Sequence, residues 1–171
     1  MTRKIFWQQI ANLNYDSLLK DRTASSLSSG GDYEICAMAR LLGHRLYYSE
    51  KLKFKHFIPK ERLQWMYLRS LRRQLGSSEA YANIYEYVIE RNKSRIKRDY
   101  TLTNKIIEDS ATLVYSTKRL YFFLFKDIEG EIYFANYEYI LGRLKTSVNL
   151  LFKYNKIIDK IQKTFFGRTP I

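Results

Sequence analysis

Two long runs in the second half of the chain repeat apolar residues at the spacing of an α-helix. Between about residues 106 and 126, and again between about 140 and 165, an apolar side chain returns every three or four positions. This period places the apolar side chains on one face of a helix. Residues 127–130 lie between the two runs and have the composition of a turn. We therefore expect two long antiparallel helices joined as a helical hairpin.

The first half of the chain contains shorter helical patterns. Helical periodicity and the flanking glycines and prolines predict helices over residues 3–13, 32–42, 59–75 and 79–91. The sequence Gly76-Ser77-Ser78 between the last two is expected to break the helix.

Two short runs between these helices have the composition of β-strands. They cover residues 45–48 and 52–57, and apolar and polar residues alternate along the second, as in a half-buried strand. The expected fold is therefore mainly α with a small β component (α+β). We divide it into residues 1–76 and a C-terminal helical region of residues 77–171.

A carboxylate and an imidazole stand at positions where functional residues often lie. Asp32 follows Gly30 and Gly31, a glycine pair that permits a tight turn, and begins a predicted helix. His56 lies near the end of the second strand-like run. Each also has a purely structural interpretation. Asp32 can serve as an N-cap that stabilises the helix by about 1 kcal/mol, and His56 can be a structural side chain on a strand.

The residues around this pair form an ordered series of short motifs. They are Gly30-Gly31-Asp32-Tyr33-Glu34-Ile35-Cys36, Gly43-His44-Arg45-Leu46-Tyr47-Tyr48, His56-Phe57-Ile58-Pro59 and Arg62-Leu63-Gln64-Trp65-Met66-Tyr67-Leu68. In order and spacing this series resembles the C-terminal part of bacterial family 2 glycosyltransferases. Residues 139–145 also resemble the end of these enzymes. The resemblance implies the distal portion of a GT-A fold, followed here by the helical hairpin.

The resemblance assigns roles to four residues. Asp32 falls where the family has its catalytic base, which removes the proton from the acceptor hydroxyl. A carboxylate near a helix N-terminus is kept ionised by the helix dipole and can accept a proton. Glu34 and Gly31 fall on the acceptor side, and Gly31 replaces the family's usual Glu, so the contact of that side chain is lost. His56 falls where GT-A enzymes place a ligand of the Mn²⁺ or Mg²⁺ ion on the donor diphosphate.

The donor-binding half of such an enzyme has no counterpart in the sequence. No Asp-x-Asp motif occurs, and no run before Asp32 resembles a buried parallel strand. We therefore expect the distal part of an enzyme of cell-surface polysaccharide synthesis. It would transfer a sugar from a nucleotide-sugar donor to a saccharide or lipid-linked acceptor. We expect this chain to be inactive alone, to bind the nucleotide sugar only when a donor-binding half is supplied, and to hold no metal by itself.

The net charge of +13 calls for an anionic partner or surface. The densest basic run covers residues 91–98, and Lys118-Arg119 stands beside the aromatic residues 121–123. Such composition suits the interface of an anionic membrane, although a solvated basic face and a buried aromatic stripe are the alternatives. The single cysteine, Cys36, is expected to be a buried thiol in a reducing compartment. We expect a cytoplasmic protein at the inner face of the cytoplasmic membrane.

Two other functions are compatible with the composition. One is a non-catalytic helical interaction module that has kept the fold of the resembled segment. The other is a basic nucleic-acid-binding protein, since the sequence pI is about 9.7 and aromatic residues are frequent. We favour nucleic-acid binding less, because no nucleic-acid motif is present and the run 91–98 contains no aromatic residue.

Overall fold

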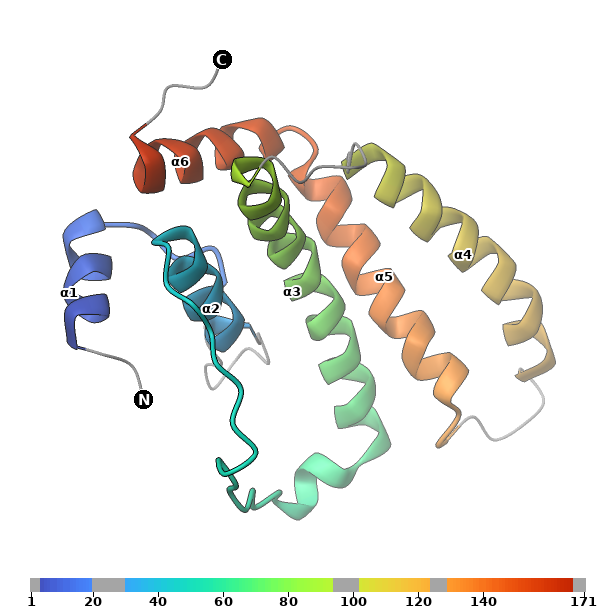
Figure 1. Cartoon of the computed structure of the whole chain (residues 1–171). Coiled ribbons are helices and arrows are strands. Elements are labelled where there is room, and N and C mark those ends of the chain that lie inside the picture. Colours follow the sequence, from blue (N-terminus) through green and yellow to red (C-terminus); the bar gives the residue numbers. More distant parts are fainter. Residues whose placement is uncertain (1–3, 20–29, 94–101, 124–128, 168–171) are drawn as a thin grey trace.

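The computed structural model describes residues 4–19, 30–93, 102–123 and 129–167, and all regular elements in these ranges are helices. They are α1 Lys4–Leu13, α2 Gly31–Leu41, the 3₁₀-helix η1 Lys60–Leu63, α3 Trp65–Asn92, α4 Leu102–Phe123, α5 Ile132–Leu150 and α6 Tyr154–Phe166 (Figure 1).

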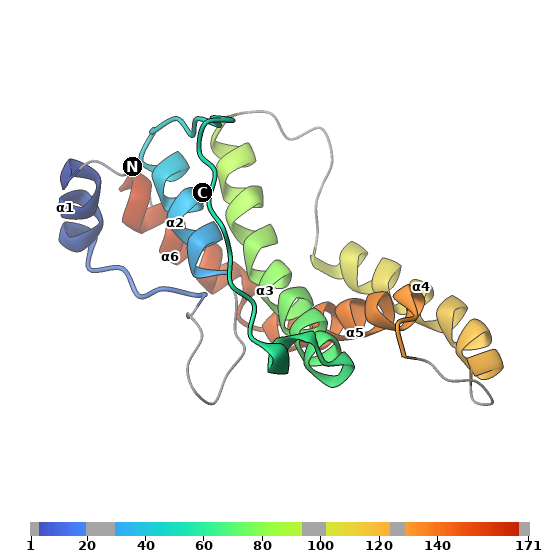
Figure 2. The ribbon, with the colours of Figure 1, turned by 90° about the horizontal axis from the view of Figure 1, so that it is seen from below.

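The three longest helices lie side by side. In both views α5 lies between α3 and α4 (Figures 1 and 2). It runs parallel to α3, as the contacts of Trp65 with Phe134 and of Glu79 with Arg143 require, and antiparallel to α4. On the other side of α3, α2 packs along the second half of α3, and α6 folds back over the C-terminal end of α3. The buried core gathers where these elements meet, around Ala37, Leu41, Ile84, Tyr85, Val88, Leu150, Ile158 and Ile161.

The predicted α+β class is wrong, since the structure has no strand in the residues it describes. The two strand-like runs, 45–48 and 52–57, lie in the connection between α2 and η1, which has no regular structure. A strand is stable only when a neighbouring strand accepts and donates its backbone hydrogen bonds. The described residues offer this connection no such neighbour, so alternation alone does not produce a strand. They likewise contain no GT-A sheet.

The predicted helix break at Gly76-Ser77-Ser78 is also wrong, because α3 continues through it. Gly76 lies where α3 crosses α5 opposite Gly142, and the two backbones are in contact there. A Cβ atom built on Gly76 would lie 1.9 Å from the carbonyl oxygen of Tyr139, and one on Gly142 would lie 2.0 Å from that of Arg73. These glycines therefore permit the close crossing of two helices. The predicted division of the chain at residue 76 falls inside α3.

Two further expectations differ from the structure. The long final helix is two helices, α5 and α6, separated at residues 151–153. This turn brings Ile158 and Ile161 back against the core, although it contains neither glycine nor proline. Cys36 is exposed rather than buried, because the core-facing side of α2 is formed by residues 34, 37, 38 and 41.

Candidate functional site

Asp32 is an exposed carboxylate in the first turn of α2. The N-cap of this helix is Gly30, whose φ of 137° is a conformation that favours glycine. The N-cap interpretation of Asp32 is thus wrong, because Asp32 is the second residue inside the helix. Its carboxylate stays near the positive end of the helix dipole and is open to solvent.

Glu34, two residues later, is almost fully buried, with 1% of its surface exposed. The backbone N–H groups of Leu18 and Leu19 donate to its carboxylate at 2.7 and 3.2 Å. The hydroxyls of Ser17 and Tyr85 also donate to it. Because these donors come from the segment after α1 and from α3, Glu34 ties three parts of the chain together.

Two tyrosines extend this buried cluster. The hydroxyl oxygens of Tyr15 and Tyr85 are 2.9 Å apart. Because the Tyr85 hydrogen is donated to Glu34, Tyr15 is the donor in this second bond. Burial and the hydrogen bond to Glu34 raise the pKa of Tyr85 far above its usual range, and burial raises the pKa of Tyr15 to about 12. Both hydroxyls therefore remain neutral donors over the physiological range.

We expect Glu34→Gln to destabilise the protein by about 2–3 kcal/mol, because the amide NH₂ would face buried donors and leave them unsatisfied. Urea unfolding followed by circular dichroism measures this loss. Hydrogen exchange should show faster exchange at the amides of Leu18 and Leu19, the two that Glu34 accepts from. Asp32→Asn is the matched control on the same turn and should cost less than about 1 kcal/mol. Equal losses for the two variants would contradict the role of Glu34 as an anchor.

A second set of contacts fixes α2 against α3 through Glu86. The Tyr33 hydroxyl donates to the Glu86 carboxylate on α3 at 2.5 Å, and Arg40 forms an ion pair with the same carboxylate. Burial opposes ionisation of Glu86, but the hydrogen bonds from Arg40 and Tyr33 outweigh it and lower its pKa. The residues on both sides of Asp32 are thus fixed in position. Gly31 is buried, and the side chains of Tyr33 and Glu34 form hydrogen bonds with α3.

His56 is exposed in the irregular connection between α2 and η1. The structure gives it no contact with Asp32, so the pair proposed from the sequence is not brought together within the described residues. The described residues also contain no cluster of three His, Cys, Asp or Glu side chains that could hold a metal ion. The role of His56 as a metal ligand stays a prediction.

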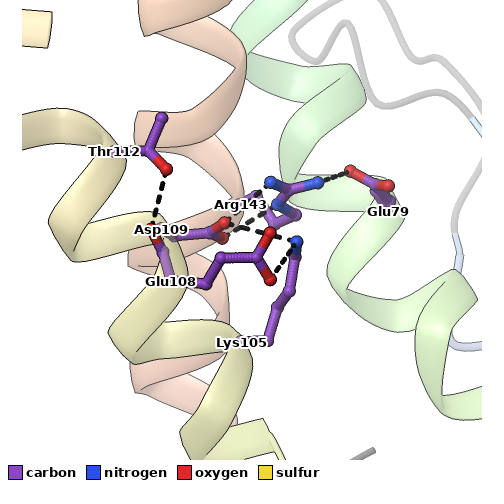
Figure 3. A network of polar contacts seen from close by, with 6 residues as sticks. All are labelled: Glu79, Lys105, Glu108, Asp109, Thr112 and Arg143. Atoms are coloured by element: carbon purple, nitrogen blue, oxygen red, sulfur yellow. Dashed lines mark hydrogen bonds and ion pairs between the residues drawn. The ribbon is translucent and has the colours of Figure 1, made fainter. Parts of the chain in front are cut away.

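A buried ion network joins α3, α4 and α5 (Figure 3). Arg143 of α5 donates two parallel hydrogen bonds to Asp109 of α4, at 2.8 and 2.7 Å, and a third to Glu79 of α3 at 2.6 Å. Lys105 lies 3.6 Å from the Asp109 carboxylate, which is 1% exposed. Burial disfavours the Arg143 cation, but the bonds to Asp109 and Glu79 outweigh it and raise its pKa.

A third buried acid, Glu138, lies between α3 and α5. Glu138 is 2% exposed and accepts hydrogen bonds from Arg69 at 2.7 and 3.1 Å and from Arg73 at 2.6 Å. Arg69 also stacks over Phe134, with its guanidinium carbon 4.4 Å from the ring centroid. Both networks have a structural role, since their buried acids, Asp109 and Glu138, are paired with arginines of the same chain.

The burial of Glu34, Asp109 and Glu138 was not predicted from the sequence, although the helical pattern contained a signal for it. Each occupies a position of its helix that the 3.6-residue period assigns to the core, in register with buried neighbours. An acidic residue on such a face predicts a buried cation or cluster of N–H donors opposite it. The three acids and their neighbours are Glu34 with Ala37 and Leu41, Asp109 with Leu102 and Leu113, and Glu138 with Ala135 and Gly142.

The basic run 91–98 and the run of residues 118–123, both expected at a membrane, lie largely outside the residues that the structure describes. Most of the run 91–98 falls beyond the described residues, and so do the side chains of residues 118–123. No helix in the described part of the chain combines the length and apolar character that crossing a bilayer requires.

Comparison of the chain with models of protein families, with curated proteins and with solved structures gave no significant match. The helical architecture and the turn that carries Asp32 are therefore the observations on which a functional proposal can rest.

Proposed function

We propose that the chain supplies the acceptor-side part of a glycosyl transfer reaction, with Asp32 as the base that removes the proton from the acceptor hydroxyl. The observation that carries the proposal is the turn around Asp32. Its carboxylate is exposed, while the neighbouring Tyr33 and Glu34 are held by hydrogen bonds to α3. A base must be both accessible to its substrate and held in place, and this turn meets both conditions.

The residue pattern around Asp32 supports sugar transfer as the reaction. Its motifs resemble those of family 2 glycosyltransferases in order and spacing, from Gly30 to Leu68. Binding of the nucleotide sugar needs a sheet that the described residues do not contain. Under this proposal a second, donor-binding polypeptide completes the reaction site, and the acceptor is a saccharide or a lipid-linked saccharide.

The proposal involves no step through a metal ion. A divalent ion needs several protein oxygen or nitrogen ligands, and His56 alone supplies one in an exposed position. The donor-binding polypeptide would have to provide the groups that neutralise the donor diphosphate.

We expect sugar transfer when the chain is mixed with the donor-binding half of a family 2 glycosyltransferase, uridine diphosphate sugars and a saccharide acceptor. The assay measures release of uridine diphosphate that depends on the acceptor. In such a mixture Asp32→Asn should lower the rate by at least about 100-fold, since the amide cannot accept the proton. The asparagine is nearly the same size, so the fold of α2 should be retained.

Glu50→Gln is the matched control, because it also neutralises an exposed carboxylate, in this case one that lies outside the helices and away from the motif around Asp32. It should change the rate by less than about twofold. Transfer that persists in Asp32→Asn would contradict the assignment of the base. Absence of transfer in a mixture where the two polypeptides form a stable complex would contradict the function itself.

A second candidate function is that of a non-catalytic interaction module. It is favoured by the exposure of large apolar side chains along residues 46–58, a surface that a folded monomer rarely leaves uncovered. In the mixture described above, this function predicts equal complex formation by the wild type and Asp32→Asn, with no effect of the chain on sugar transfer.

A further inference from the structure

The connection between α2 and η1 exposes an unusual number of large apolar side chains. Tyr48, Phe54 and Phe57 are between 86% and 89% exposed, so they project from the protein rather than line a groove. Leu46, Tyr47, Leu52 and Ile58 are also at least half exposed. The connection leaves the end of α2 and runs along the outside of the molecule to the start of α3 (Figures 1 and 2).

The apolar surface continues onto the adjoining end of the helices. Leu63 in η1 and Met66 in α3 are 71% and 63% exposed. Ile132, the first residue of α5, is 68% exposed and lies at the same end, because Trp65 packs against Phe134 with ring centroids 6.5 Å apart. We call residues 45–66 together with Ile132 the basic aromatic surface.

The same surface is strongly cationic. Residues 45–62 contain six Lys or Arg and two Glu. Within the described part of the chain, none of these six cations has an ion-pair partner. They are Arg45, Lys51, Lys53, Lys55, Lys60 and Arg62.

Charge and shape together select the kind of partner. A second copy of the chain would bring the same six cations face to face, and like charges in contact oppose association. A protein partner of ordinary type would meet a surface with complementary pockets, whereas these side chains project singly. Aromatic rings and lysines that alternate on a projecting segment are typical of contact with the headgroup region of an anionic membrane.

We propose that the basic aromatic surface binds anionic lipid headgroups, with Phe54 and Phe57 entering the interface between headgroups and acyl chains. Lys53 and Lys55, which flank Phe54 in the sequence, bind the lipid phosphates. The chain then lies on the membrane with this end of α3 and α5 facing the lipid. This inference rests on exposure and charge alone, and it is independent of the proposed sugar transfer.

Vesicle flotation with the full chain tests the proposal. The chain should float with vesicles of phosphatidylcholine and phosphatidylglycerol at about 3:1 and remain unbound with phosphatidylcholine alone. Lys53→Gln/Lys55→Gln should weaken binding by roughly tenfold or more. Phe57→Ser should weaken it by roughly tenfold, because the ring is lost from the interface.

Matched controls lie at the opposite end of α5, in the turn that follows it and in the first turn of α6. Phe152 is 97% exposed and Lys153 and Lys156 are exposed as well. Phe152→Ser and Lys153→Gln/Lys156→Gln make the same changes in side chain and net charge, and each should weaken binding by less than about threefold. All these positions are exposed, so circular dichroism should show unchanged folding for each variant.

Three results would overturn the proposal. One is absence of binding to the anionic vesicles. Another is equal weakening by the variants at residues 53, 55 and 57 and by their controls, which would show that net charge alone decides binding. The third is a stable dimer in light scattering that Phe57→Ser dissociates, which would make a second copy the occupant of this surface.

Discussion

Gly76→Ala should destabilise the protein by about 3 kcal/mol or more, although the same change on an exposed helix stabilises it by about 1 kcal/mol. The added methyl group would lie 1.9 Å from the Tyr139 carbonyl oxygen, which is backbone and cannot rotate away. The helices α3 and α5 must therefore move apart. Urea unfolding followed by far-ultraviolet circular dichroism measures the loss, and Gly142→Ala should give a loss of similar size for the same reason.

The two substitutions act on one crossing, which supplies a further test. Once the first methyl group has separated the helices, the second meets less obstruction, so the double variant should lose less than the sum of the single losses. Ser70→Ala, at an exposed position on α3, is the control and should change stability by less than about 0.5 kcal/mol. A stabilising effect of Gly76→Ala would contradict the close crossing.

Arg143→Met should destabilise the protein by about 3–5 kcal/mol, because it leaves the buried Asp109 carboxyl group without the Arg143 guanidinium that it pairs with. Lys105, whose ammonium group lies 3.6 Å from the Asp109 carboxylate, would remain beside it. Glu79 is partly exposed and can turn to solvent, so most of the loss is expected from Asp109. Thermal and urea unfolding both report the change.

The double variant Asp109→Leu/Arg143→Met separates the charge effect from loss of packing. A buried ion pair replaced by apolar side chains of similar size is often close to neutral in stability. We therefore expect the double variant to regain most of the stability lost in Arg143→Met. If it is as unstable as the sum of both single variants, the network contributes through packing rather than through charge compensation.

The helices of the first half were predictable because their signals are local. The apolar period over residues 3–13 predicts α1, and the glycine pair with Gly43 locates α2 within one residue. The backbone hydrogen bonds of a helix join residues four positions apart, so nearby side chains decide whether it forms. The same local reasoning failed at Gly76, because the contact that requires a glycine there comes from the backbone of Tyr139, more than sixty residues away.

The candidate site shows the same division. Asp32 was found from its position after the glycine pair, and the structure places it exposed in the first turn of α2. The anchoring role of Glu34 was not found, because its donors lie on Ser17, Leu18, Leu19 and Tyr85 and only folding brings them together. The position of Glu34 on the core-facing side of α2 was the signal in the sequence that could have indicated its burial.

The sequence by itself determined the amphipathic helices, the charge of +13 and the position of Asp32 at a helix start. The tertiary structure alone decided the continuity of α3, the burial of Glu34, Asp109 and Glu138 with their partners, and the irregular form of residues 45–58. The physical reason is the range of the interactions. Helical hydrogen bonds are local, whereas a strand needs a second strand and a buried carboxylate needs donors brought from elsewhere in the chain.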